Sequence, residues 1–317
     1  MPEPAATFAD VSAAAERIAP YVHRTPVATS ATLRRESGAA VFFKCENLQK
    51  VGAFKARGAL NAVLSLDEDE AARGVVTHSS GNHGAALAYA AAIRGIPCTV
   101  VMPDHAPEVK IEAVRSYGAN IEICRHVDRE PATARIIQQT GATLVHPYNN
   151  AVVIAGQGTA ALELIEATGD LDIVITPIGG GGLMSGTAIT TRHKLPNARI
   201  IGAEPYAVDD AYRSLQLGQI QPPIADPKTV ADGLLTALGD LTFATMSWAG
   251  VEIVRVEENA IIAAALFHLH RMKILVEPSG ATGLAAVRRL GDTIAGKRIG
   301  VIISGGNTDL SWLPSGG

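Results

Sequence analysis

Short apolar runs alternate with helical segments along most of this chain, and a glycine or a polar turn follows many of the runs. Strands are predicted at 41–44, 75–77, 98–102, 121–124, 143–145, 173–178, 199–203, 251–256 and 298–303. Helices are predicted around 7–19, 55–66, 85–94, 107–117, 132–139, 160–168, 183–193 and 259–272. Apolar strands in regular alternation with helices are typical of a parallel sheet covered by helices on both faces. The pattern therefore predicts an α/β fold.

The amino-acid composition and net charge limit the kinds of molecule that this protein is expected to bind. The 317 residues are 47% hydrophobic and 18% charged, as in a globular protein, and the net charge is -4 with no basic block. This argues against a nucleic acid or an anionic membrane as a partner. The three cysteines have no metal-type or redox-type spacing, and the first residues lack the apolar core of a signal peptide. We expect a soluble cytoplasmic protein with reduced thiols.

Lys55 lies at a predicted strand-to-helix turn, with Phe54 beside it and small residues around it. A lysine held among apolar groups loses solvation of its ammonium form, so its pKa falls and its amine can attack a carbonyl. An exposed lysine at a helix N-terminus is the alternative interpretation of this residue alone.

Four consecutive glycines, Gly179–Gly182, follow a predicted buried strand and precede a helix. Glycine lets backbone N–H groups approach an anion, and the positive end of the helix dipole favours a phosphate there. The same loop also fits a tight turn without ligand, or a dinucleotide site with Glu204 as the ribose-binding acid. An NAD-binding enzyme or a non-catalytic α/β protein therefore remains an alternative at this point.

The combination of features favours one cofactor. Lys55, the glycine loop and the polar segment 79–83 together supply an amine for an aldehyde and a cradle for a phosphate, which pyridoxal 5'-phosphate requires. The motifs GAFKARGA, SSGNHG, IAGQGT, GGGGLMSG, VEPSGA and ISGGN occur in this order. They resemble the serine/threonine dehydratase and serine racemase family, which belongs to the fold type II (tryptophan-synthase-β-like) pyridoxal-phosphate enzymes.

The resemblance implies a role for each matching residue. Lys55 would bind the cofactor aldehyde and serve as the base at the substrate α-carbon, and Ser304 would face the pyridine nitrogen. A neutral hydroxyl there would leave the ring largely unprotonated, which by hypothesis favours elimination over racemisation. The other implied cofactor contacts are Phe54 and Glu277 near the ring, Asn82 at the phenolic oxygen, and Gly179, Gly180, Gly181, Gly182 and Leu183 at the phosphate.

The segment 79–83 resembles the clamp that this family places around the substrate carboxylate, and it contributes Ser79, Ser80, Asn82 and His83. Members that racemise serine or dehydrate hydroxyaspartate carry serine at the position of Ser80, whereas dedicated dehydratases often carry alanine. Racemisation needs an acid or base on each face of the carbanion, and Lys55 and Ser80 would supply them. A serine that only caps the following helix is an equally good interpretation.

Glu204 and Asp210, with the backbone carbonyl of Val208, resemble the divalent-cation site of the racemase-like members. Oxygen ligands of this kind suit Mg²⁺ or Ca²⁺. The alternative is a solvated acidic turn. Tyr148, in the motif HPYNN, is a further position that we expect to touch the substrate side chain.

These resemblances predict two open parallel-sheet domains, each of three layers, with the cofactor between them. The large domain would comprise 1–68 and 150–317, and the small domain 69–149. The expected activity is elimination of water from L-threonine or L-serine to give a 2-oxo acid and ammonia. Serine racemisation and 3-hydroxyaspartate dehydration are the alternatives. The family also suggests a homodimer.

Overall fold

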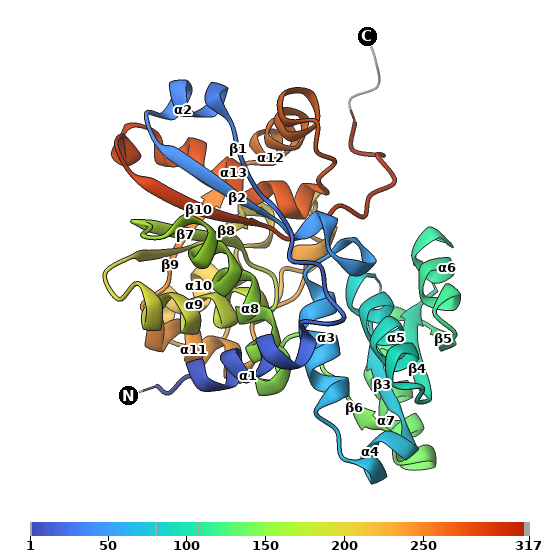
Figure 1. Cartoon of the computed structure of the whole chain (residues 1–317). Helices are drawn as coiled ribbons and strands as arrows, with labels where there is room; N and C mark the ends of the chain where they lie inside the picture. Colours follow the sequence, from blue (N-terminus) through green and yellow to red (C-terminus); the bar gives the residue numbers. More distant parts are fainter. Residues whose placement is uncertain (1, 80, 105, 107, 314–317) are drawn as a thin grey trace.

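The computed structural model describes residues 2–79, 81–104, 106 and 108–313, and it contains two separate sheets (Figure 1). The larger sheet has six strands in the order β1-β2-β10-β7-β8-β9. Only the pair β1 and β2 is antiparallel, and the other neighbours are parallel. The strands are β1 Val27–Thr29, β2 Ala40–Cys45, β7 Ile173–Pro177, β8 Arg199–Pro205, β9 Glu252–Val256 and β10 Arg298–Ile303.

The smaller sheet is entirely parallel, in the order β5-β4-β3-β6. Its strands are β3 Val75–His78, β4 Cys98–Pro103, β5 Asn120–Cys124 and β6 Thr143–Leu144. All four lie within the segment 69–149 that the sequence assigns to a small domain. The domain boundaries themselves stay a prediction.

The central strands of both sheets are buried on both faces: alternate residues of a strand point to opposite sides, and nearly all residues of β4, β7 and β10 are buried. In β7, Ile173 and Ile175 belong to the core cluster that includes Leu284 of helix α13 (Pro278–Leu290), whereas Val174 packs in the cluster with Leu164 of helix α8 (Ala151–Thr168). In the smaller sheet, strand residues likewise divide between a core shared with α5 (Asn82–Arg94) and one shared with α7 (Arg129–Thr140). The sequence-based fold class, α/β with parallel sheets, is confirmed.

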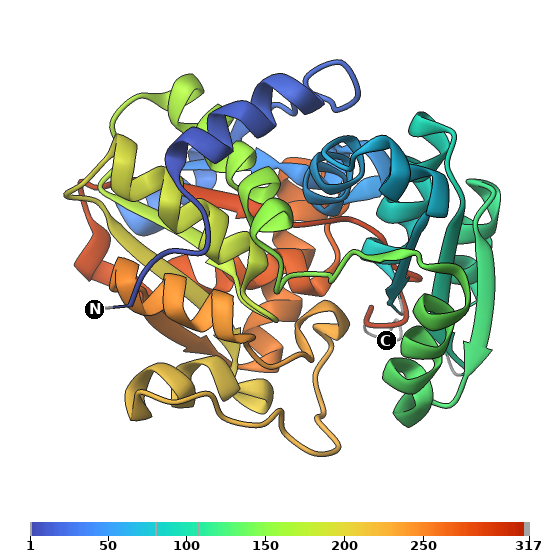
Figure 2. The ribbon, with the colours of Figure 1, turned by 90° about the horizontal axis from the view of Figure 1, so that it is seen from below.

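Helix α3 connects the two halves. It contacts α5 of the smaller sheet and α8 of the larger one, and Figure 2 shows it between them. The helices are α1 Phe8–Ile18, α2 Ala31–Ser37, α3 Lys55–Leu64, α4 Glu68–Arg73, α5 Asn82–Arg94, α6 Glu108–Ser116, α7 Arg129–Thr140, α8 Ala151–Thr168, α9 Gly182–Lys194, α10 Asp210–Leu217, α11 Asp240–Ala249, α12 Glu258–Phe267 and α13 Pro278–Leu290.

Several helices differ from the expectation for local reasons. Helix α8 begins at Ala151, earlier than predicted, because the Asn150 side chain accepts from the amides of Val152 and Val153 as an N-cap. Helix α2 was not predicted, although Ser30 caps it in the same way. The helix predicted over 259–272 divides into α12 and a π-helical turn, His268–Met272. In the described part of the chain, no helix has both the length and the apolar character required to cross a membrane.

Candidate active site

Lys55 is the first residue of α3, and its side chain is half-buried. The Nζ atom donates to the carbonyl oxygen of Pro147 at 2.7 Å and lies 5.1 Å from the centroid of the Phe54 ring. Burial lowers the pKa of Lys55 to about 8. At pH 7 about one tenth of the amine is therefore uncharged and nucleophilic, far more than for a lysine in water.

The backbone around Lys55 is attached to the end of β10. Phe54 N donates to the carbonyl oxygen of Ser304 at 2.9 Å, and Ala53 forms an isolated β-bridge with Gly305. Ser304, the predicted partner of the pyridine nitrogen, is buried next to this bridge. The turn that carries Lys55 and the segment that carries Ser304 are thus brought together, as both predicted roles require.

Two residues after Lys55, a fully buried arginine anchors α3. The Arg57 guanidinium donates to both oxygens of Glu46, at 2.7 and 2.8 Å, and to both oxygens of Glu163, at 2.8 and 2.9 Å. Lys44 Nζ donates to Glu163 at 2.5 Å. Two cations therefore neutralise two carboxylates in this buried network, which fixes the helix beneath the reactive amine.

The glycine loop lies where β7 ends and α9 begins. Gly181 has φ +85, a left-handed conformation that favours glycine, and a side chain on Gly180 would overlap the Tyr148 ring, with atoms only 2.3 Å apart. Among the described residues, no backbone carbonyl accepts from the amides of Gly180 and Gly181. Free amides at a helix N-terminus are suited to an anion such as a phosphate.

The predicted carboxylate clamp is only partly described, because Ser80 lies outside the described residues. Ser79 Oγ accepts from the amide of Gly81 at 3.2 Å, which shapes the turn before α5. His83 is buried, and its Nε2 lies 3.0 Å from the carbonyl oxygen of Val145. Burial, followed by the charge of Lys55, lowers the pKa of His83 to about 3. The His83 ring is therefore neutral, and its hydrogen bond attaches α5 to the end of β6.

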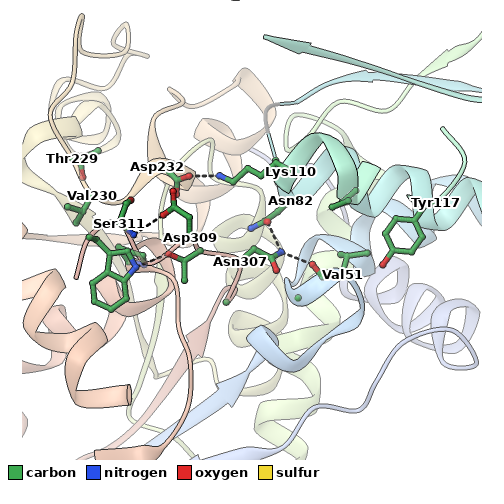
Figure 3. A pocket seen from close by; sticks show the side chains of 18 residues that line it. Val51, Asn82, Lys110, Tyr117, Thr229, Val230, Asp232, Asn307, Asp309 and Ser311 are labelled. Carbon is green, nitrogen blue, oxygen red and sulfur yellow. Dashed lines mark hydrogen bonds and ion pairs between the residues drawn. The ribbon is translucent and has the colours of Figure 1, made fainter. Parts of the chain in front are cut away.

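Asn82 is held by two neighbours. Its Nδ2 lies 3.2 and 3.3 Å from the carboxylate oxygens of Glu277, and its Oδ1 accepts from Asn307 at 2.9 Å. Figure 3 shows the Asn82–Asn307 contact continuing to the Val51 carbonyl, beside a cavity of about 830 Å³. The lining formed by the described residues includes neither Lys55 nor the glycine loop. Asn82, a predicted cofactor contact, therefore also lines this cavity.

The predicted cation ligands lie at the end of β8. Both carboxylates are almost fully buried, and Glu204 accepts from the amides of Ala211 and Tyr212 at 2.9 Å each. Burial raises the pKa of Glu204 to about 8 and that of Asp210 to about 6. Asp210 Oδ2 has no hydrogen-bond partner among the described residues. Val208, between them, belongs to a short 3-10 turn.

Two residues that the sequence analysis did not select lie beside the site. His146 Nδ1 accepts from the amide of Asn149 at 2.9 Å, and its ring packs edge-to-face against Tyr148 at 4.6 Å. Arg129 begins α7, and its charge contributes, after burial, to the lowered pKa of His78. A cation at a helix N-terminus is electrostatically unfavourable, but the predicted helix covers only 132–139, so the sequence did not indicate that Arg129 stands at this position.

The residues present fit pyridoxal phosphate. A half-buried lysine with a lowered pKa suits the aldehyde, and a loop of unpaired amides suits the phosphate. Phe54 and Ser304 border the space near Lys55.

Comparison with known proteins agrees with this fit. The profile of the family "Pyridoxal-phosphate dependent enzyme" matches residues 18–305. A serine racemase from Dictyostelium discoideum is 49% identical over 97% of this chain and 96% of its own, and its crystal structure superposes with a TM-score of 0.92. A beta-hydroxyaspartate dehydratase from Paracoccus denitrificans is 50% identical over 97% of this chain and 98% of its own.

A threonine deaminase of known crystal structure, from T.th., is 41% identical, covers 96% of this chain and 99% of its own, and has a TM-score of 0.91. The family profile spans both sheets and the predicted site residues from Phe54 to Ser304. The chain therefore belongs to the fold type II family of pyridoxal-phosphate-dependent enzymes, whose relatives similar to this chain are racemases and ammonia-lyases.

Proposed function

We propose that this enzyme removes the α-proton of a small β-hydroxy amino acid and eliminates water, giving a 2-oxo acid and ammonia. The observation that carries the proposal is the half-buried Lys55 amine, whose pKa desolvation lowers to about 8. A base with a pKa near the working pH combines a useful uncharged fraction with enough proton affinity to take the α-proton. The names of the relatives support 3-hydroxyaspartate as the substrate more than the L-threonine expected from sequence.

The cofactor, when bound, withdraws electrons from the substrate α-carbon and so acidifies its proton. Gly179–Gly182 and Leu183 would hold its phosphate, Phe54 would pack on its ring, and Ser304 would face its nitrogen. Asn82 and Glu277 would lie at the ring edge. Lys55 Nζ would take the α-proton, and the β-hydroxyl would leave as water.

Substrate recognition would use the segment 79–83 for the α-carboxylate, with Ser79, Ser80, Asn82 and His83 as the predicted contributors. For the second carboxylate of 3-hydroxyaspartate, Arg129 is the best candidate. It is half-buried at the start of α7, and its charge acts on both His78 and Tyr148. An arginine fork suits planar carboxylates, whereas serine and threonine have no second carboxylate to offer it.

Serine racemisation is the second candidate, and the names of several relatives favour it. It requires Ser80 to return a proton on the face opposite Lys55.

We also propose a divalent cation, Mg²⁺ or Ca²⁺, held by Glu204, Asp210 and the Val208 carbonyl. Two buried carboxylates with raised pKa values and an unpartnered oxygen on Asp210, counted among the described residues, form a donor set that suits such a cation.

The test uses cofactor-loaded protein with L-threo-3-hydroxyaspartate, L-serine and L-threonine, each with and without Mg²⁺. Ammonia, 2-oxo acid and D-serine are quantified together. We expect the highest kcat/KM for 3-hydroxyaspartate, and Arg129→Met should lower that value far more than the value for L-serine. A Lys55→Ala variant should lose activity and the visible absorbance of bound cofactor, whereas Lys50→Ala should retain both. D-serine as the major product would favour the racemase alternative, and no reaction with any of the three would refute the proposal.

Further predictions concern the assembly and location of the protein. We propose a homodimer in the cytoplasm, with domains at 1–68 plus 150–317 and at 69–149. Light scattering of the purified protein tests the dimer, and limited proteolysis tests the domain boundaries.

A further inference from the structure

Arg255, on β9, does not form an ion pair with the carboxylate that lies opposite it in the sheet. In the parallel pairing of β8 with β9 it stands directly opposite Glu204, one of the predicted cation ligands. Its guanidinium nevertheless donates to Asp209, at 2.7 Å. Arg255 therefore pairs with the carboxylate of Asp209 and not with that of Glu204, its neighbour in the sheet.

Two aromatic rings hold Arg255 in this position. Its guanidinium carbon lies 3.9 Å from the centroid of the Tyr212 ring and 4.6 Å from that of Tyr206. A guanidinium stacked on aromatic rings gains cation–π attraction, and its planar fork is fixed in direction. Tyr206 and Tyr212 flank the predicted ligands Val208 and Asp210 in sequence, so the clamp spans the whole ligand loop.

The clamp is also joined to a ligand through the backbone. The amide of Tyr212 donates to Glu204 Oε2 at 2.9 Å, while the ring of Tyr212 covers Arg255. On the other side, Asp209 accepts from both Arg255 and Arg213, which leaves it neutralised. Among the described residues, Glu204 and Asp210 are the carboxylates of this loop left without a cation, and Asp210 Oδ2 is buried and unpartnered.

We propose that Arg255 is a positioning residue for the divalent cation: it withdraws Asp209 from the site and fixes the loop 206–212 around the Glu204–Asp210 pair. The inference rests on the cation proposed above. Outer-shell partners of this kind orient the atoms that bind the metal. Mg²⁺ demands near-ideal octahedral geometry, whereas Ca²⁺ tolerates a looser arrangement. A rigid loop therefore matters more to Mg²⁺ than to Ca²⁺.

Positioning and plain electrostatics predict opposite effects for Arg255→Met. Removing a positive charge near the site should by itself tighten cation binding. Loss of the clamp should instead weaken Mg²⁺ binding, by roughly ten-fold as for other outer-shell partners, with a smaller loss for Ca²⁺. The sign of the change thus separates the two explanations.

Arg289 provides a matched control. Its NH2 donates to the Tyr206 hydroxyl at 3.1 Å and its guanidinium carbon lies 5.7 Å from the same ring, but Asp209 accepts from Arg255 and Arg213 instead. Arg289→Met removes a charge from the same cluster without opening the clamp. Arg255→Lys keeps the charge and loses the planar fork, and it is the second variant in case Arg255→Met folds poorly.

Isothermal titration of cofactor-loaded protein with Mg²⁺ and with Ca²⁺ gives both affinities for each variant. We expect the ratio of Mg²⁺ to Ca²⁺ affinity to fall in Arg255→Met, to fall less in Arg255→Lys, and to stay at the parental value in Arg289→Met. Equal or tighter Mg²⁺ binding by Arg255→Met, or an equal loss for both ions, would overturn the positioning role of Arg255. The proposed cation site would stand in that case. If the parent protein binds neither ion, the cation proposal and this inference fall together.

Discussion

Two regions of this molecule each shield two carboxylates from solvent, Glu163 less completely than the other three, and the regions differ in what the chain provides as partners. Behind Lys55, Glu46 and Glu163 are paired with Arg57 and Lys44. At the end of β8, Glu204 and Asp210 are also buried, yet they receive amide donors or no donor from the described residues.

The pKa shifts follow this difference. Burial by itself would raise the pKa of Glu46, but the charge and hydrogen bonds of Arg57 outweigh it, and the pKa is lowered. Burial raises the pKa of Glu204 to about 8 with no cation to oppose it. A buried carboxylate that the chain itself neutralises serves the fold, whereas one left unneutralised indicates a ligand from outside.

The largest expected effect comes from breaking the neutralised network. Arg57→Met leaves Glu46 and Glu163 buried without their shared cation, which should lower the free energy of unfolding by about 3–5 kcal/mol. Guanidinium chloride denaturation measures the change. As a control, Arg199→Met removes a half-exposed pair with Glu252 and should cost about 0–1 kcal/mol. Equal losses in the two variants would contradict the structural role given to the network.

Glu204→Gln should abolish stabilisation by a divalent cation. A cation at about one hundred times its Kd adds about 2.7 kcal/mol to the stability of the parent protein. Thermal unfolding with Mg²⁺, compared with unfolding in chelator, should therefore show a rise in Tm for the parent protein and none for the variant. Glu252→Gln, a surface substitution, should keep the full response. A response preserved in Glu204→Gln would remove Glu204 from the cation site.

The pH dependence of the free energy of unfolding extends the comparison to a further buried carboxylate, Glu277. It is buried beside Asn82, and burial, followed by the charge of Asp232, raises its pKa from 4.5 to about 7. Its folded-state pKa is above the unfolded value, so the associated stability is complete below pH 4.5 and declines as the pH rises through 7. Between about pH 5 and pH 8 the cofactor-free parent should lose about 1–3 kcal/mol more than Glu277→Gln. The same pH dependence of stability in both proteins would argue against a raised pKa of Glu277. Glu46, with its lowered pKa, has the opposite sign and loses its contribution in acid.

The smallest effect is expected where charges are paired but exposed. Lys110 of α6 reaches Asp232 at 2.5 Å, and the aspartate side chain is 52% exposed (Figure 3). Lys110→Met should change the free energy of unfolding by about 0.2–1 kcal/mol, and high salt should erase the difference. A larger loss that persists in salt would mean that this contact holds the two sheets together more firmly than a surface pair can.

Local sequence determined much of the fold, because strand and helix periodicity is set by neighbouring residues. The nine predicted strands all occur in the structure, and the glycine loop and Lys55 stand at strand-to-helix turns as expected. Residues at the carboxyl ends of parallel strands must converge, so a site built from Lys55, Gly179–Gly182 and Ser304 could be inferred before any coordinates.

The partners of each side chain were decided by the tertiary structure alone. No residue near Arg255 in the sequence indicates that its side chain pairs with Asp209 instead of Glu204. The contact depends on the register of β8 with β9 and on the rings of Tyr206 and Tyr212. In the same way, Asn82 meets Glu277 across 195 positions and Asn307 across 225. Residue type and spacing fix which chemistry is available, whereas charge pairing, burial and pKa depend on distances that form only when the chain packs.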